Sequence, residues 1–275
     1  KKQKKIFYTM KISKFKKICV VTGSRAEYGL LKNLLFLIKK EKLFKLQLLV
    51  TGTHLSKKYG FTISDIVKDR HKVKDKIDLK LNKDDVFSIA NSMSYGLKKF
   101  VKIFEKNKPD IIILLGDRYE IFTASVAATL CRVPIGHIHG GEITKSLVDE
   151  AFRHSITKMS HLHFAATDDY KKRVIQMGEN KKNVYLVGNM TIDNINNTEL
   201  FNVSQIKKKI KFYENKKNIL VTFHPVTNTP KETKRQFKNI LRALNDFKNT
   251  NIIFTKPNSD QGCKDIIRMT QNFIK

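Results

Sequence analysis

The chain has 275 residues, a formal net charge of +29 and a pI near 10.0, and 41% of its residues are hydrophobic. This length suffices for one large α/β unit or two smaller ones, and the apolar runs are too short to cross a membrane. The lysines are scattered over nearly every predicted helix rather than gathered with aromatic residues, so we expect solvated lysine faces and no nucleic-acid partner.

Strand-like and helix-like segments alternate along the chain, which is typical of a parallel sheet with crossover helices. Short apolar runs predict strands at 18–22, 46–51, 111–115, 135–138, 162–166 and 184–187. Helical periodicity predicts helices at 30–40, 84–107, 119–131, 148–159 and 168–177. After a polar stretch, a second series has strands at 219–223 and 252–255 and helices at 231–247 and 260–274.

These segments predict two units of unequal completeness. Residues 1–15 form a basic N-terminal extension, and residues 16–188 form a Rossmann-like domain that carries most of the polar motifs. We interpret the polar stretch at 189–203 as a linker and residues 204–275 as the start of a second βα domain. Two strands are too few for a sheet that stands alone, so we expect the second domain to be truncated in this chain.

The sequence predicts neither a signal segment nor a disulfide framework. The amino-terminal stretch KKQKKIFYTMKISKF is basic but lacks the apolar core of a signal segment, so we expect a cytoplasmic protein. Cys19, Cys131 and Cys263 lie far apart without a CxxC spacing. Neither a disulfide framework nor a thiolate metal site is therefore predicted.

Polar motifs follow two of the predicted strands, at the sheet edge where open α/β folds bind ligands. After the first strand, TGSRAEYG offers small residues and Arg25, which suits a phosphate or carboxylate but equally a tight turn with a surface arginine. After the third strand, LLGDRYE places Asp117 and Arg118 at the end of an apolar run. Asp117 is either a helix cap or an acid or base directed into the crevice.

The densest motif is PIGHIHGGEITKSLVDEAFRH. His137 and His139 are two residues apart and would share one face of an extended strand, the next two glycines permit close approach, and Glu142 follows. Asp149 and Arg153 are four residues apart on a predicted helix, as are the adjacent glutamate and histidine, and both pairs also fit ordinary ion pairs on a helix face. Such a crevice is suited to proton transfer on an anionic substrate.

An alternative treats the His-x-His pair as metal ligands, with Glu142 or Asp117 completing a metal-dependent hydrolase site. The same spacing recurs in SHLHF, where His161 and His163 also fit a partly buried strand edge. The chain has no HExxH motif and no third ligand motif near the first pair.

Six motifs in register, CVVTGSRAEYGLL, GDRYE, HIHGGEIT, VDEAFRHSITK, VGNMTIDN and FHPVTN, resemble the hydrolysing UDP-N-acetylglucosamine 2-epimerase family of bacterial sialic-acid and legionaminic-acid pathways. The resemblance spans nearly the whole chain from Lys16. It implies an α/β fold with two Rossmann-like domains of glycosyltransferase-B type, the second of which binds the nucleotide. It also implies a nucleotide-sugar substrate, no metal or other cofactor, and, for the full-length protein, a homo-oligomer (dimer or tetramer).

The reaction implied by the resemblance is an elimination followed by a hydration. The C2 proton leaves, the bond from C1 to the diphosphate breaks, and water adds to the resulting glycal with inversion at C2, which gives a nucleoside diphosphate and a free sugar such as N-acetylmannosamine. The implied catalytic residues are Asp117, His139, Glu142, Asp149 and Arg153. The implied substrate-binding residues are Arg25, Arg118, His224, Asn258 and Asp260. Some relatives carry a glutamate at the position of His139, and we expect the histidine to substitute for it.

The motifs leave the substrate open. UDP-N-acetylglucosamine is the main expectation, UDP-N,N'-diacetylbacillosamine of legionaminic-acid synthesis is the alternative, and GDP could replace UDP. The carboxylate that removes the C2 proton is not assigned. A noncatalytic nucleotide-sugar-binding protein would present the same crevice without turnover.

Overall fold

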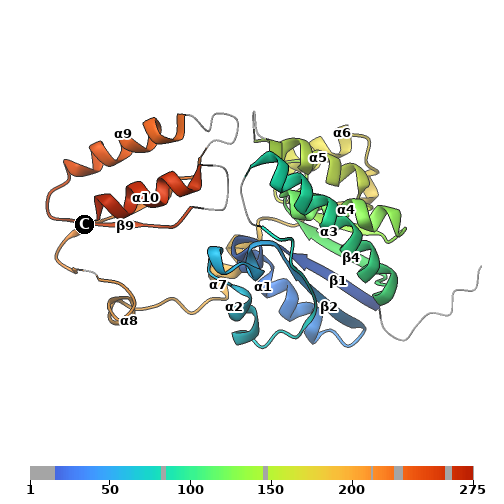
Figure 1. Cartoon of the computed structure of the whole chain (residues 1–275). Coiled ribbons are helices and arrows are strands. Elements are labelled where there is room, and N and C mark those ends of the chain that lie inside the picture. Colours follow the sequence, from blue (N-terminus) through green and yellow to red (C-terminus); the bar gives the residue numbers. More distant parts are fainter. Residues whose placement is uncertain are drawn as a thin grey trace, which may run out of the picture.

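In the computed structural model, seven parallel strands form one sheet in the order β3-β2-β1-β4-β5-β6-β7 (Figure 1). The structure describes residues 16–81, 85–144, 148–211, 213–225, 232–257 and 262–274. The strands are β1 (Lys16–Thr22), β2 (Phe44–Thr51), β3 (Val73–Ile77), β4 (Ile111–Leu115), β5 (Ile135–Ile138), β6 (Leu162–Ala165) and β7 (Val184–Leu186). This sheet confirms the expected α/β class and the expected strands of the first unit.

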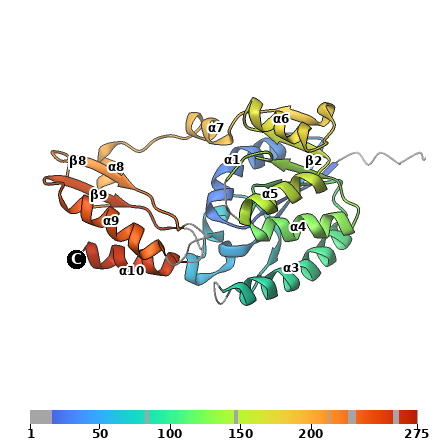
Figure 2. The ribbon, with the colours of Figure 1, turned by 90° about the horizontal axis from the view of Figure 1, so that it is seen from above.

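Helices cover both faces of the sheet (Figure 2). One face packs against α3 (Val86–Asn107), α4 (Tyr119–Leu130) and α5 (Val148–Met159), and the opposite face packs against α1 (Arg25–Lys40), α2 (Ile63–Lys68) and α7 (Met190–Asn196). The remaining helix of this unit, α6 (Asp168–Gln176), lies beside β6 and β7. The sheet is therefore the middle layer of three.

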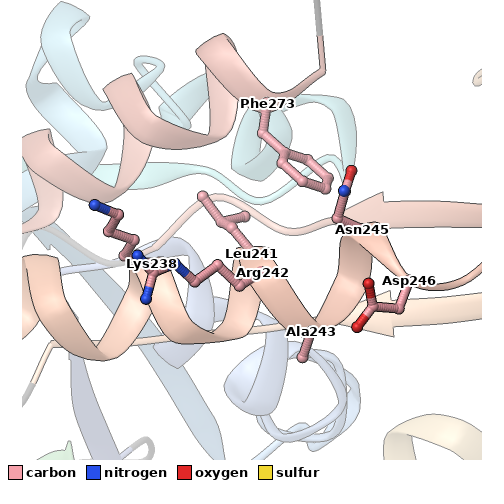
Figure 3. Close-up of a pocket in the computed structure, with 7 residues that line it drawn as sticks. All are labelled: Lys238, Leu241, Arg242, Ala243, Asn245, Asp246 and Phe273. Atoms are coloured by element: carbon pink, nitrogen blue, oxygen red, sulfur yellow. The ribbon is translucent and has the colours of Figure 1, made fainter.

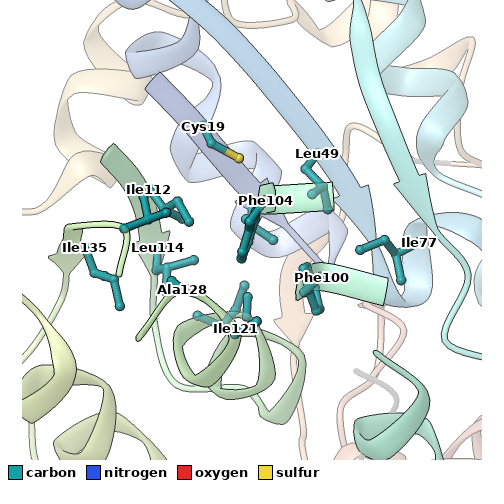
Figure 4. Close-up of a cluster of buried hydrophobic side chains, with 14 of the residues drawn as sticks. Cys19, Leu49, Ile77, Phe100, Phe104, Ile112, Leu114, Ile121, Ala128 and Ile135 are labelled. Carbon is teal, nitrogen blue, oxygen red and sulfur yellow. The ribbon is translucent and has the colours of Figure 1, made fainter. Parts of the chain in front are cut away.

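The central strand β4 shows why the sequence folds this way. Ile112 and Leu114 join the cluster under α3 and α4 (Figure 4), while Ile113 and Leu115 join the cluster under α1. A strand that buries both faces is apolar at every position, which is the pattern of a covered parallel sheet. The sheet edge differs, because β3 reads VKDKI and leaves alternate residues exposed. Because three of its five residues are charged, the apolar pattern of the sequence does not predict this strand.

The first helix starts earlier than the periodicity predicts. Ser24 caps α1, since its hydroxyl accepts a hydrogen bond from the Glu27 backbone N–H at 3.3 Å, and Arg25 is already helical. Serine is a favoured helix cap. Gly29 lies inside the helix, and its low helix propensity moved the predicted start to residue 30. Arg25 therefore projects from the first turn of a helix rather than from a loop.

The stretch expected as a linker begins with α7. The Asn194 side-chain amide donates to the Gly29 and Leu30 carbonyl oxygens at 2.9 and 3.0 Å, so α7 packs on α1 of the first unit. We still propose a unit boundary in this stretch, and the contacts of α7 favour a position after Asn196.

Among the described residues, the carboxyl-terminal unit has a second sheet of two parallel strands, β8 (Lys217–Val221) and β9 (Thr250–Phe254), close to the positions that the sequence predicts. Its helices are α8 (Val203–Lys207), α9 (Thr233–Asn245) and α10 (Cys263–Phe273). An open groove of about 580 Å³ follows the carboxyl end of α9 beside Phe273 (Figure 3). Because α9 runs back from the end of β8 toward the start of β9, this groove faces away from the strand ends at which α/β sheets bind ligands.

Among the described helices, none combines the length and the apolar character needed to span a bilayer.

Candidate active site

The sheet has its topological switch point between β1 and β4. These neighbours are parallel, and their following helices, α1 and α4, lie on opposite faces of the sheet. A crevice at the carboxyl ends of two such strands is the usual ligand site of an open α/β fold. The TGSRAEYG and GDRYE motifs both begin at this edge.

A buried arginine joins the strand ends to α5. The Arg153 guanidinium donates to Asp117 Oδ2, to the Glu142 carbonyl oxygen at 2.9 Å and to Thr144 Oγ1 at 2.8 Å. Arg153 is only 5% exposed, whereas the Asp117 side chain is partly open to solvent. The guanidinium therefore holds Asp117 as an accessible carboxylate and ties it to the HIHGGEIT segment.

His139 and Glu142 form a second pair. His139 Nδ1 lies 3.2 Å from Glu142 Oε1, and His139 Nε2 is buried without a hydrogen-bond partner among the described residues. Burial raises the pKa of Glu142, but the hydrogen bond and charge of His139, with the charge of Arg153, outweigh it and lower that pKa overall. Glu142 is thus ionised at neutral pH and orients the His139 ring through Nδ1.

The expectation that the two histidines share a strand face is wrong. Strand β5 ends at Ile138, and His139 adopts a left-handed conformation with φ +66° that turns the chain out of the sheet. His137 is fully buried, with Nε2 2.8 Å from the Gly116 carbonyl oxygen and Nδ1 3.1 Å from Thr157 Oγ1. Burial lowers the pKa of His137 to about 4. The His137 ring is therefore neutral, and its role is to connect the strand ends to α5 through these two hydrogen bonds.

The metal alternative gains no support from this geometry. Within the described part of the chain, no three His, Cys, Asp or Glu side chains gather in a way that could hold a metal ion. His163 is buried with Nε2 3.2 Å from Glu179 Oε2, and His161 Nδ1 accepts a hydrogen bond from the Ile135 N–H at 3.3 Å. His163 is therefore buried within β6, which lies between β5 and β7, and His161 bonds to β5 at the start of β6.

The two glycines of HIHGGE serve packing rather than the approach of a ligand. A Cβ on Gly140 would lie 2.9 Å from Thr157 Oγ1, and a Cβ on Gly141 would lie 2.4 Å from the Tyr170 carbonyl oxygen of α6. The Arg173 guanidinium also donates to the Gly141 carbonyl oxygen. These glycines let the loop fit between the helices that carry the site.

The two predicted phosphate-binding arginines differ in exposure. The Arg25 side chain is 80% exposed, with Nε 3.9 Å from Asp65 Oδ2. Arg118 is mostly buried and folds back on Glu120, with Nε 3.3 Å from Oε2. Arg25 is free to reach an anion in the crevice, whereas Arg118 is held by a carboxylate.

Asp149 and Glu150 occupy the first turn of α5, and both are partly buried. Glu150 Oε2 accepts a hydrogen bond from the Thr144 backbone N–H at 2.8 Å, and Oε1 lies 3.9 Å from His154 Nε2. His224 is exposed in the segment after β8. Asn258 and Asp260 lie outside the described residues.

Sequence reasoning missed two carboxylates at this edge. Glu27 and Glu120, within the quoted TGSRAEYG and GDRYE motifs, are both buried, at 6% and 0% exposure. The available signal was an acidic residue among the apolar positions of two helices, which an ordinary acidic first turn also explains.

The family model for UDP-N-acetylglucosamine 2-epimerase matches residues 37–275 of this chain. A Campylobacter jejuni protein named GDP/UDP-N,N'-diacetylbacillosamine 2-epimerase (hydrolyzing) is 39% identical over 260 residues, covering 94% of this chain and 67% of that protein. The polysialic acid biosynthesis protein P7 of Escherichia coli is 40% identical over 261 residues, covering 94% and 66%. This chain thus spans about two thirds of the length of these curated relatives.

The fold has counterparts among solved structures. The crystal structure of UDP-GlcNAc 2-epimerase from Neisseria meningitidis bound to UDP-GlcNAc superposes with a TM-score of 0.74 and 20% identity, over 94% of this chain and 70% of the other. This likeness confirms the expected glycosyltransferase-B type of fold.

Proposed function

Because this chain belongs to the UDP-N-acetylglucosamine 2-epimerase family, we propose that it acts as a hydrolysing 2-epimerase on a nucleotide-linked N-acetylated amino sugar. The observation that carries the proposal is the cluster at the carboxyl ends of β4 and β5, where Arg153 joins Asp117 to the segment of His139 and Glu142. The name of the Campylobacter relative supports N,N'-diacetylbacillosamine linked to UDP or GDP, and the ligand of the Neisseria structure supports UDP-N-acetylglucosamine.

The reaction requires proton transfer on both faces of the sugar. One group removes the C2 proton as the bond from C1 to the diphosphate oxygen breaks, and another returns a proton to the opposite face of C2 as water adds at C1. Asp117 and His139 are the groups best supported for these transfers, because each is oriented by a charged neighbour. Arg153 hydrogen-bonds Asp117, and Glu142 pairs with His139. Asp149 at the start of α5 is the further candidate.

The leaving diphosphate needs positive charge. Arg25 is exposed at the first turn of α1, where the helix dipole also favours an anion. Arg118 and His224 are the other proposed contacts, and Asn258 and Asp260 remain proposals from the sequence. Cations placed at the departing oxygen stabilise the charge that develops in the transition state.

Turnover in D₂O tests the reaction directly. The purified chain is incubated with UDP-N-acetylglucosamine, UDP-N,N'-diacetylbacillosamine and their GDP counterparts, and free nucleotide and free sugar are measured. We expect release of the nucleoside diphosphate from at least one substrate, with deuterium at C2 of the epimerised sugar. Binding of the nucleotide sugars without release would instead identify a noncatalytic binding protein.

Replacing Arg25 with Ala is expected to weaken UDP binding by about tenfold or more, because one charge-assisted hydrogen bond to a phosphate is lost. The unfolding midpoint should not change, since the side chain is exposed. Lys68→Ala is the matched control, because Lys68 Nζ also lies 4.0 Å from an oxygen of Asp65 but belongs to no phosphate motif. Calorimetric titration with UDP measures both variants, and equal affinities would remove Arg25 from the diphosphate site.

His139→Gln is expected to lower turnover by about 10²-fold while UDP affinity is retained, because a general base is lost but the nucleotide contacts remain. Glu142→Gln should have a smaller effect in the same direction, since the imidazole stays but loses its ionised partner. Steady-state rates with the best substrate provide the measurement. A rate for His139→Gln equal to that of the wild type would exclude the imidazole from proton transfer.

A further inference from the structure

Two buried glutamates meet at the amino ends of α1 and α4, on opposite faces of the sheet. Glu27 lies in the first turn of α1 and Glu120 in the first turn of α4. Gly23 lies between them, because a Cβ built on it would be 3.4 Å from Glu120 Cβ and 3.5 Å from Glu27 Oε2. Two glutamate side chains from distant parts of the chain thus approach the Gly23 backbone at the switch point.

The polar contacts of this pair are few. The Gly23 N–H donates to Glu27 Oε2 at 2.7 Å, while Glu27 Oε1 is buried and finds no hydrogen-bond partner in the described ranges. Glu120 pairs with the Arg118 guanidinium, at 3.3 Å from Nε and 3.5 Å from one terminal nitrogen, and it also forms a side-chain hydrogen bond with Tyr119. Within the described ranges, the Arg118 guanidinium therefore acts on both buried carboxyl groups.

Such a pair carries a proton in part of the molecules at neutral pH. Burial, and after it the charge of Glu120, raises the pKa of Glu27 to about 7, although Arg118 and the hydrogen bonds from Gly23 and Ser24 oppose the shift. Two carboxylates that share one buried site raise the pKa of one of them. With one proton on the pair, the two carboxyl groups and the guanidinium carry no net charge.

We propose that Glu27 and Glu120 are positioning residues of the diphosphate subsite that together bind at most one proton, and that the occupancy of this proton rises when a nucleoside diphosphate binds beside Arg118. This inference rests on the proposed function. An anion that also binds the Arg118 guanidinium reduces the positive charge that stabilises the two carboxylates. A proton from solvent then binds the glutamate pair and compensates for this loss. The step is an equilibrium in which protein, diphosphate and one proton form a complex, and no covalent bond changes.

Unfolding of the ligand-free chain tests the shared proton. The folded-state pKa of Glu27 is above its unfolded value of about 4.5. Its favourable contribution is therefore complete below pH 4.5 and is lost as the pH rises through about 7. Relative to Glu27→Gln, which cannot ionise, the wild type should lose a few degrees of unfolding midpoint between pH 5.5 and pH 8.5. Glu41→Gln, at the exposed far end of α1, is the control and should follow the wild type.

Calorimetric titration with UDP tests the coupling to the ligand. Measured at pH 7.5 in two buffers of different ionisation enthalpy, the wild type should take up a fraction of a proton, at most about one, per UDP bound. Glu27→Gln should bind UDP with less uptake, and Glu120→Gln should also show less, because removing its charge lowers the pKa of Glu27. The second variant keeps the test valid if the first folds poorly.

The outcomes separate this proposal from the proposed function. Equal proton uptake by wild type and both variants, or a wild-type unfolding midpoint with the same pH dependence as that of Glu27→Gln, would overturn the proton-sharing pair. Failure of the wild type to bind UDP would overturn the nucleotide site and with it the ligand-coupled uptake. The ligand-free unfolding midpoints would still decide whether Glu27 and Glu120 share a proton.

Discussion

Asp117→Asn is expected to lower the rate of nucleoside diphosphate release by about 10²- to 10⁴-fold, the usual contribution of a general acid or base. Asn keeps the shape of the side chain and still accepts a hydrogen bond from Arg153, but it cannot take up a proton. The fold should survive, because Arg153 keeps its bonds to the Glu142 carbonyl oxygen and to Thr144. Steady-state turnover and the unfolding midpoint are measured on the same preparation.

Asp110→Asn is the matched control for this variant. Asp110 precedes β4 at the opposite end from Asp117, and its carboxylate accepts a hydrogen bond from the Lys17 N–H at 2.7 Å. Near-normal turnover is expected for this control because it is a strand length away from the crevice. Turnover of Asp117→Asn within a few-fold of the control would remove Asp117 from the mechanism. A large fall in the unfolding midpoint of Asp117→Asn alone would assign the carboxylate a structural role instead.

Gly141→Ala is expected to destabilise the fold by roughly 2 to 5 kcal/mol, because two costs add. Gly141 has φ +82°, a left-handed conformation that disfavours any side chain. The added Cβ would also lie 2.4 Å from the Tyr170 carbonyl oxygen, and a helix backbone cannot yield as a flexible side chain can. Denaturant unfolding followed by circular dichroism measures the loss.

Gly116→Ala separates the two costs. Gly116 also has φ +82°, but a Cβ there would meet no atom within 4 Å. This variant should lose only the conformational cost, about 1 to 2 kcal/mol. The difference between the two variants then measures the close approach of α6 to the HIHGGE loop. Equal losses would show that α6 moves away at little cost and that Gly141 is required for its backbone conformation alone.

Much of the first unit could be predicted from the sequence, because its central strands are buried on both faces. Strand β4 begins and ends where its apolar run does, and β5 has the bounds that the sequence predicts. The exposed edge could not be predicted in this way, since β3 alternates charged residues with partly buried ones. The start of α1 was misplaced because the Ser24 cap and Gly29 give conflicting local signals, and the cap prevails in the folded chain.

For the candidate site, too, the sequence predicts some features and not others. Asp117, Glu142 and Arg153 stand out in the sequence because each is polar beside an apolar run or on a helix next to one. Their partners are not visible there. Helical spacing suggested a neighbour four residues from Arg153, whereas the fold adds Asp117, which is 36 residues away along the chain.

The sequence by itself determined the order of strands and helices, and with it the edge of the sheet at which the polar motifs gather. Parallel strands bring their carboxyl ends to one edge whatever their separation in the chain. Only the tertiary structure decided which of those groups touch, which glycines face a helix rather than a ligand, and that Glu27 and Glu120 are buried together around Gly23. The burial of these two side chains and their proximity depend on how α1 and α4 pack across the switch point. The local pattern of residues does not show how closely two helices pack.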